Sequence, residues 1–169
     1  MKHVGLVLSL CLLAACQPSN DDYDGLTGRV MLYQVDEAEL MTLLQEDAII
    51  VIANPDSEWS QIIIPILNRV AVDANQRVEY FNGVSFRAGG SSDVQTLVQQ
   101  IQATTFLADY DPRLYDELYM PIVLKVTQGQ ITLAHVGTVP GHRMVAGAIP
   151  PLTIEQEVTL ISFYQSFFD

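Results

Sequence analysis

The sequence has no cysteine beyond position 16. Of its 169 residues only two are cysteines, Cys11 and Cys16. Because both lie near the N-terminus, they cannot provide a disulfide framework for the rest of the chain. Without a thiol, the chain after Cys16 can neither attack a disulfide nor resolve a mixed one. Thiol–disulfide exchange is therefore excluded for this part of the protein.

Positive charge is scarce as well. The chain has 8 lysine and arginine residues against 20 acidic residues, a formal net charge of −12, and its only lysines are Lys2 and Lys125. Such a surface repels nucleic-acid phosphates and anionic lipid headgroups. We therefore expect no nucleic-acid binding, and membrane contact through a lipid alone. Solubility explains most of the acidic charge, which would also suit a cationic peptide or protein partner.

The apolar run at the N-terminus, Val4 to Ala15, is too short to cross a bilayer as a permanent helix. It follows a short basic start, a pattern typical of a secretory signal. Leu13-Ala14-Ala15-Cys16 resembles the lipobox of bacterial lipoproteins. The resemblance implies a lipoprotein signal peptide over 1–15, cleavage before Cys16 and a lipid anchor on that cysteine. The alternative is an ordinary signal peptide with an incidental cysteine.

A lipid on Cys16 would place the protein on the outer face of the cytoplasmic membrane, or at an outer membrane in a diderm cell. Residues 16–28 are polar, contain proline and glycine and show no apolar period, which predicts a flexible tether. Asp22-Tyr-Asp24 is faintly similar to a calcium loop, but the other ligands are missing. We expect one globular domain over 29–169.

Apolar patterns predict an α/β order of elements. The branched run Ala48–Ala53 indicates a strand buried on both faces. Apolar residues at three- and four-residue steps indicate a helix from Trp59 to Asn75, with Pro65 inside it. Two runs on either side of Gln128-Gly129, 122–126 and 131–136, indicate a hairpin.

Other elements are expected on weaker patterns. They are a strand within 29–34, a helix over 36–46 capped by Asp36 and Glu39, a strand over 78–86, helices in a segment over 88–119, and a helix from Thr153 to Phe168. The apolar stripe expected on the last helix is Ile154, Val158, Ile161, Tyr164 and Phe168.

One tetrad, Ser57-Glu58-Trp59-Ser60, stands at the start of the helix that contains Pro65. Much further on, Met120-Pro121 opens the hairpin, which ends in Val136-Gly137. In this order the landmarks resemble the thioredoxin-like family, from about Val35 to Phe168. The resemblance implies a three-layer α/β/α sandwich with a central mixed sheet, a helical insertion over 88–119, and a cis-proline at Pro121 that faces the tetrad.

The departures from the family matter more than the match. Ser57 and Ser60 stand where the family has its two redox cysteines, and Val51 stands where many members have a buried carboxylate. The resemblance therefore implies a fold retained for binding rather than an oxidoreductase. We expect no cofactor and no metal, because two isolated histidines, His135 and His142, do not make a metal site.

The family also suggests how such a protein binds. The residue before its cis-proline offers backbone groups to an extended peptide, and this pairing does not need the thiols. We therefore expect a peptide or an envelope protein as the partner, its identity unknown. The predicted groove is lined by Ser57, Glu58, Trp59, Ser60, Met120 and Pro121.

Simpler roles exist for these residues. Trp59 could pack on the sheet instead of anchoring a partner, Glu58 could be solvated, and Ser57 could cap the helix. Two other functions stay open. One is a structural component of an envelope complex whose groove is filled by the chain's own loop, 137–151. The other is a Ser- or Glu-dependent enzyme, although no motif links a histidine to Ser57.

Overall fold

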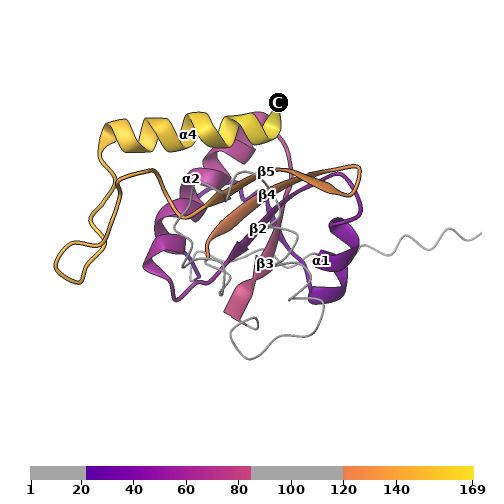
Figure 1. Ribbon diagram of the computed structural model, residues 1–169, viewed down its shortest axis with the longest axis horizontal. Helices are drawn as coiled ribbons and strands as arrows, with labels where there is room; N and C mark the ends of the chain where they lie inside the picture. The colour runs from indigo at the N-terminus through magenta and orange to yellow at the C-terminus, as the bar shows by residue number, and fades with distance from the viewer. Residues whose placement is uncertain (1–21, 85–119) are drawn as a thin grey trace, which may run out of the picture.

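The computed structural model of the chain describes residues 22–84 and 120–169 (Figure 1). Its elements there are β1 (Leu32–Gln34), α1 (Glu37–Leu43), β2 (Ala48–Ala53), α2 (Glu58–Ala74), β3 (Val78–Asn82), β4 (Ile122–Thr127), β5 (Gln130–Val136) and α4 (Ile154–Phe168). The predicted signal segment, Cys16 and the insertion over 88–119 lie outside the described residues. Within those residues, no helix has the length and apolar character needed to cross a membrane.

The five strands form one mixed sheet in the order β1-β3-β2-β4-β5. β3 runs parallel to β1 and β2, whereas β4 is antiparallel to both β2 and β5. Ile52 pairs with Ile122, which in turn pairs with Val136. The end of β2, the start of β4 and the end of β5 therefore lie at one end of the sheet. We call it the site end.

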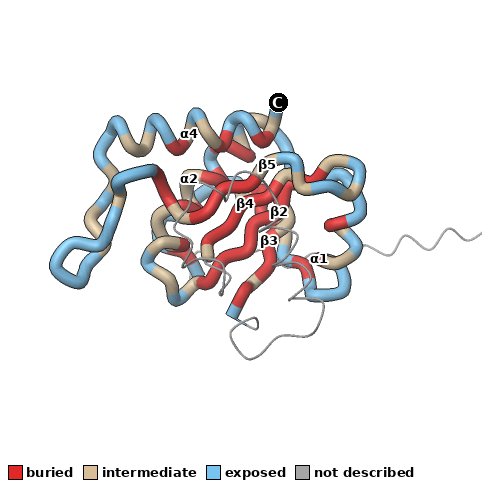
Figure 2. Tube along the Cα trace, viewed as in Figure 1, coloured by how far each residue is buried: buried red, intermediate tan, exposed pale blue. Residues whose placement is uncertain are grey.

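Alternating residues of β2 divide the core into two layers. Ile49, Val51 and Ala53 pack with side chains of α2 and α4, whereas Ile50 and Ile52 pack with side chains of α1. Helices thus cover both faces of the sheet, and the buried residues concentrate on the strands (Figures 1 and 2). This arrangement is an α/β sandwich of the thioredoxin-like type, as predicted.

Local sequence signals set most of the element boundaries. β2 has the predicted limits, and both predicted capping boxes are present, Asp36 with Glu39 and Thr153 with Gln156. The hairpin turn places Gln128 and Gly129 at φ values of 52° and 72°, the combination that suits the twist of two paired strands. Three elements, β1, α1 and β3, are shorter than their apolar patterns suggested.

The predicted stripe on α4 is wrong in its first half. Ile154 and Val158 are 82% and 59% exposed, and the buried residues are Leu160, Tyr164 and Phe167. They run from the middle of the helix to its C-terminal end, so this part of the helix covers the sheet. The sequence contains two overlapping apolar series, and packing against the sheet selects the one that contains Leu160 and Phe167.

The predicted tether is too long, because its C-terminal part belongs to the packed domain. Tyr23 and Leu26 are almost completely buried. Residues 22–31, which we call the strap, run along α2 and are held by two amide side chains. Gln61 accepts from Asp24 N at 2.9 Å and donates to Asp22 O at 2.8 Å, and further along α2 Asn68 accepts from Met31 N and donates to Arg29 O.

A buried pair of tyrosines joins the strap to the sheet. The hydroxyl oxygens of Tyr23 and Tyr80 are 2.9 Å apart, and the two rings meet edge to face. Burial raises the pKa of Tyr80 to about 12, although the hydrogen bond from Tyr23 opposes this, and burial raises the pKa of Tyr23 further still. The pair shares its apolar cluster with Val51. Both hydroxyls therefore stay protonated, in a layer without a carboxylate at position 51.

The two tyrosines should be energetically coupled, so the stability losses caused by replacing each of them should not add. Tyr23→Phe or Tyr80→Phe leaves the other hydroxyl buried without its partner, so each should lower the free energy of unfolding by about 1–3 kcal/mol. The double variant should lose clearly less than the sum of the two, and Tyr33→Phe, at a half-buried edge position, should change little. Urea unfolding of the four variants measures the coupling, and strict additivity would contradict a direct bond.

Candidate functional site

The tetrad, the cis-proline and the loop after β5 meet at the site end of the sheet. The Met120–Pro121 peptide bond is cis, as predicted. The sheet register places Pro121 across from Ala53, the last residue of β2, only four residues before Ser57. The carbonyl of Pro121 accepts a hydrogen bond from Gly137 N at 2.9 Å. The two segments that resembled the family therefore lie together, although they are more than sixty residues apart in sequence.

Ser60 is a structural residue. Its side chain is completely buried, and its Oγ accepts a hydrogen bond from Asn54 N at 3.2 Å. Asn54 also accepts from Asp56 N through its side chain and from Ser57 N through its carbonyl, both at 2.9 Å. This compact turn joins β2 to α2. The Ser60 hydroxyl therefore stabilises the start of the helix.

Ser57 occupies the N-cap position of α2, but its side chain makes no capping hydrogen bond. The prediction that its hydroxyl caps the helix is therefore wrong. The turn at Asn54 fixes this end of α2 without it, because the backbone N–H of Ser57 is already bonded there. Ser57 is half-buried and Glu58 is exposed. Both remain available to a ligand at the surface of the site end.

The side chain and the backbone of Met120 have different roles. A side chain added at Gly83 would collide with Met120 Sδ and would also meet Ile52, so the thioether packs into the α1 side of the core. Among the residues that the structure describes, the backbone N–H and carbonyl of Met120 have no hydrogen-bond partner. Met120 can therefore contribute its backbone to a groove, whereas its side chain supports the fold.

Trp59 packs on the loop that follows β5. Its ring meets that of His142 edge to face, with the centroids 5.3 Å apart and an interplanar angle of 83°. His142 is held from both sides, because its Nδ1 lies 2.8 Å from Thr138 Oγ1 and its Nε2 lies 2.8 Å from Pro150 O. A carbonyl only accepts, so Nε2 carries the hydrogen, and in the neutral ring Nδ1 accepts from the Thr138 hydroxyl.

His135 lies elsewhere, between β5 and α4. Its ring is tilted against that of Phe163 and meets that of Tyr164 edge to face, at centroid distances of 4.6 and 5.4 Å. Burial lowers the pKa of His135 to about 4, although a backbone hydrogen bond with Thr138 opposes this shift, so the ring is neutral at pH 7. It belongs to the packing of the core. Within 22–84 and 120–169, no group of three or more His, Cys, Asp or Glu side chains is placed to hold a metal ion.

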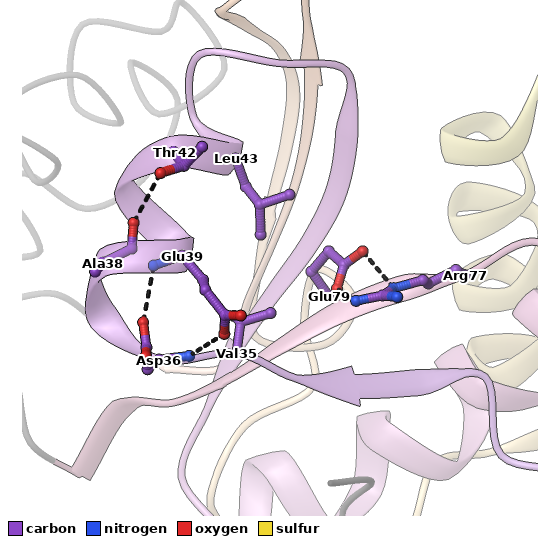
Figure 3. Close-up of a pocket in the computed structure, with 8 residues that line it drawn as sticks. All are labelled: Val35, Asp36, Ala38, Glu39, Thr42, Leu43, Arg77 and Glu79. Atoms are coloured by element: carbon purple, nitrogen blue, oxygen red, sulfur yellow. Dashed lines mark hydrogen bonds and ion pairs between the residues drawn. The ribbon is translucent and has the colours of Figure 1, made fainter. Parts of the chain in front are cut away.

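A surface pocket of about 360 Å³ lies beside α1 at the β1 edge (Figure 3). Its charged groups are paired with one another: Asp36 and Glu39 form the capping box, and Arg77 makes an ion pair with Glu79. Because these charges already satisfy each other, a ligand would gain little from them. The site end is the better candidate.

Three residues of the site end were missed by sequence reasoning. Asn54 precedes a proline and an aspartate, a turn signal that could have been noticed. Gln61 and His142 had no comparable signal. The first is one of several polar residues on a helix, and the second is an isolated histidine in a loop. Their roles depend on segments that come together only in the fold.

No family model and no curated protein matches this chain. Among solved structures, a chain from a study of the thiol resolving mechanism in yeast mitochondrial 1-Cys peroxiredoxin is similar at 14% identity and a TM-score of 0.41. The match covers 64% of this chain and 88% of that one. At this level we base no argument on it, and the fold follows from the strand order and the helices on both faces.

The contact between Trp59 and His142 predicts a fluorescence change. Trp59 is the only tryptophan of the chain, so its emission reports this contact alone. His142→Ala removes the ring and both hydrogen bonds, and should shift the emission to longer wavelength and raise acrylamide quenching about twofold. Arg143→Ala, at the exposed neighbouring position, should change neither. Unchanged emission in His142→Ala would show that the loop does not cover Trp59 in solution.

Proposed function

We propose that this protein is a redox-inactive thioredoxin-like lipoprotein, anchored through a lipid on Cys16 outside the cytoplasm, that binds an extended peptide or a segment of a partner protein at the site end. The ligand pairs with the backbone of Met120 and contacts Trp59 and the first turn of α2. The reaction of the family is absent, because neither Ser57 nor Ser60 provides a thiolate.

The observation that supports this proposal best is the open backbone of Met120 beside Pro121. A peptide N–H and a carbonyl that have no partner within the described part of the chain, just before the start of β4, offer the pairing that an added strand needs. Trp59 supplies a half-buried aromatic surface nearby, of the kind that dominates binding energies. The acidic surroundings, which include Asp56 and the exposed Glu58, favour a ligand with positive charge.

A second candidate function follows from the contact of Trp59 with His142. Here the loop 137–151 occupies part of the groove, and the protein acts as a structural component of an envelope complex. The two hydrogen bonds of His142 support this alternative, since they hold the loop in place. A serine-dependent enzyme has less support, because Ser60 Oγ is buried and bonded and both ring nitrogens of His142 are engaged.

Peptides selected from a random linear library on the chain from residue 17 onward should bind at the site end. Trp59→Ala should weaken their binding by tenfold or more, which corresponds to about 1.4 kcal/mol. Methylating the peptide nitrogen that pairs with Met120 O should weaken it similarly, whereas methylating the next nitrogen, which points away, should not. Isothermal titration calorimetry measures both effects.

The matched control is Tyr33→Ala, which removes a half-buried aromatic ring from the β1 edge. It should leave the affinity unchanged. Equal affinities for Trp59→Ala and the original chain would contradict binding at the site end. A failure to select any peptide, together with the fluorescence shift predicted for His142→Ala, would favour the structural alternative.

A further inference from the structure

The tip of the loop 137–151 is an exposed apolar turn. From residue 144 to residue 149 its sequence is Met-Val-Ala-Gly-Ala-Ile, without a charged or polar side chain. Met144 and Val145 are 54% and 59% exposed, and the turn projects from the body of the domain (Figures 1 and 2). Exposed apolar residues gathered in this way on a soluble domain mark a contact surface.

The turn pairs part of its own backbone. Val145 and Ala148 exchange two hydrogen bonds, at 2.8 and 3.1 Å, and the two residues between them adopt positive φ values, 52° at Ala146 and 85° at Gly147. At its base, His142 fixes the loop to Trp59 and Pro150. These four paired groups can enter the bilayer interface without being left unsatisfied, and water and headgroups there can bond the remaining backbone groups of the turn. Arg143, exposed beside it, can reach lipid phosphates.

The short segment between Cys16 and the strap limits how far this turn can lie from a lipid on Cys16. Five residues, 17–21, separate Cys16 from Asp22. Fully extended, these six steps span about 20 Å. Asp22 is bonded to Gln61 in the first turns of α2, the same end that Trp59 and His142 occupy. A lipid on Cys16 would therefore keep the site end, rather than the opposite end of the domain, close to a bilayer.

We propose that the turn 144–149 inserts into the interfacial region of the bilayer and holds the site end toward the membrane. This inference rests on the lipidation of Cys16 in the proposed function. The turn 144–149 is too small to bind a free protein to a bilayer by itself. The lipid on Cys16 keeps the turn at a high effective concentration near the membrane surface. The net charge of −12 makes a zwitterionic bilayer the appropriate surface. The groove then receives segments that emerge from the same membrane.

Single-tryptophan variants on vesicles test this orientation. The chain from residue 16 onward has one thiol, Cys16, which is coupled to a maleimide lipid in phosphatidylcholine vesicles that contain brominated acyl chains. Trp59→Phe/Val145→Trp places the reporter in the turn. Trp59→Phe/Asp73→Trp places it at an exposed position near the far end of α2, about 22 Å along the helix axis from Glu58.

Fluorescence at position 145 should be quenched at least twofold more than at position 73. Ala148→Trp, on the same turn, should repeat the result and provides a second reporter should Val145→Trp not fold. Equal quenching at both ends, or none in the turn while the protein is bound to vesicles, would overturn the inference. Because the lipid is attached chemically and peptide affinity is measured without vesicles, failure here is distinguishable from failure of lipidation or of peptide binding.

Discussion

Asn54 provides the constraint on which the site end depends. Standing directly after β2, it makes three hydrogen bonds, to the backbone N–H groups of Asp56 and Ser57 and to Ser60 Oγ. These bonds fix where α2 begins and which way its first turn faces. Serine suits the last of them well, since a hydroxyl oxygen accepts hydrogen bonds better than a sulfur does. The Ser60 hydroxyl therefore helps to fix the geometry of the site end.

Two further segments converge on this first turn of α2. The strap reaches it through Gln61, and the loop after β5 reaches it through His142, which contacts Trp59. Both attachments use polar side chains whose donors and acceptors are engaged together, so each is specific in geometry. Beside them, the backbone groups of Met120 have no hydrogen-bond partner among residues 22–84 and 120–169. One end of the domain therefore combines a frame fixed by side-chain hydrogen bonds with the cis peptide bond before Pro121.

Much of the fold could be predicted because its signals are local. The branched run of β2, the capping boxes at Asp36 and Thr153 and the turn at Gln128-Gly129 all act within a few residues. The strap was missed because Tyr23 and Leu26 are separated by polar residues, and their burial depends on α2 and β3. On α4, packing against the sheet determines which of two apolar series is buried, and this packing cannot be read from the helix sequence alone. The contact between Trp59 and His142 could not be predicted, because nothing in the sequence around either residue indicates the other.

We propose that Ser57 and Ser60 occupy the positions of a redox pair in a scaffold whose geometry is retained. Replacing both with cysteine in the chain from residue 17 onward, which has no other cysteine, tests it directly. We expect Ser57→Cys/Ser60→Cys to form an internal disulfide, seen as the loss of two hydrogen atoms by mass spectrometry, while the original chain shows no insulin reduction. Two free thiols that persist under oxidised glutathione, in a folded double variant, would contradict it.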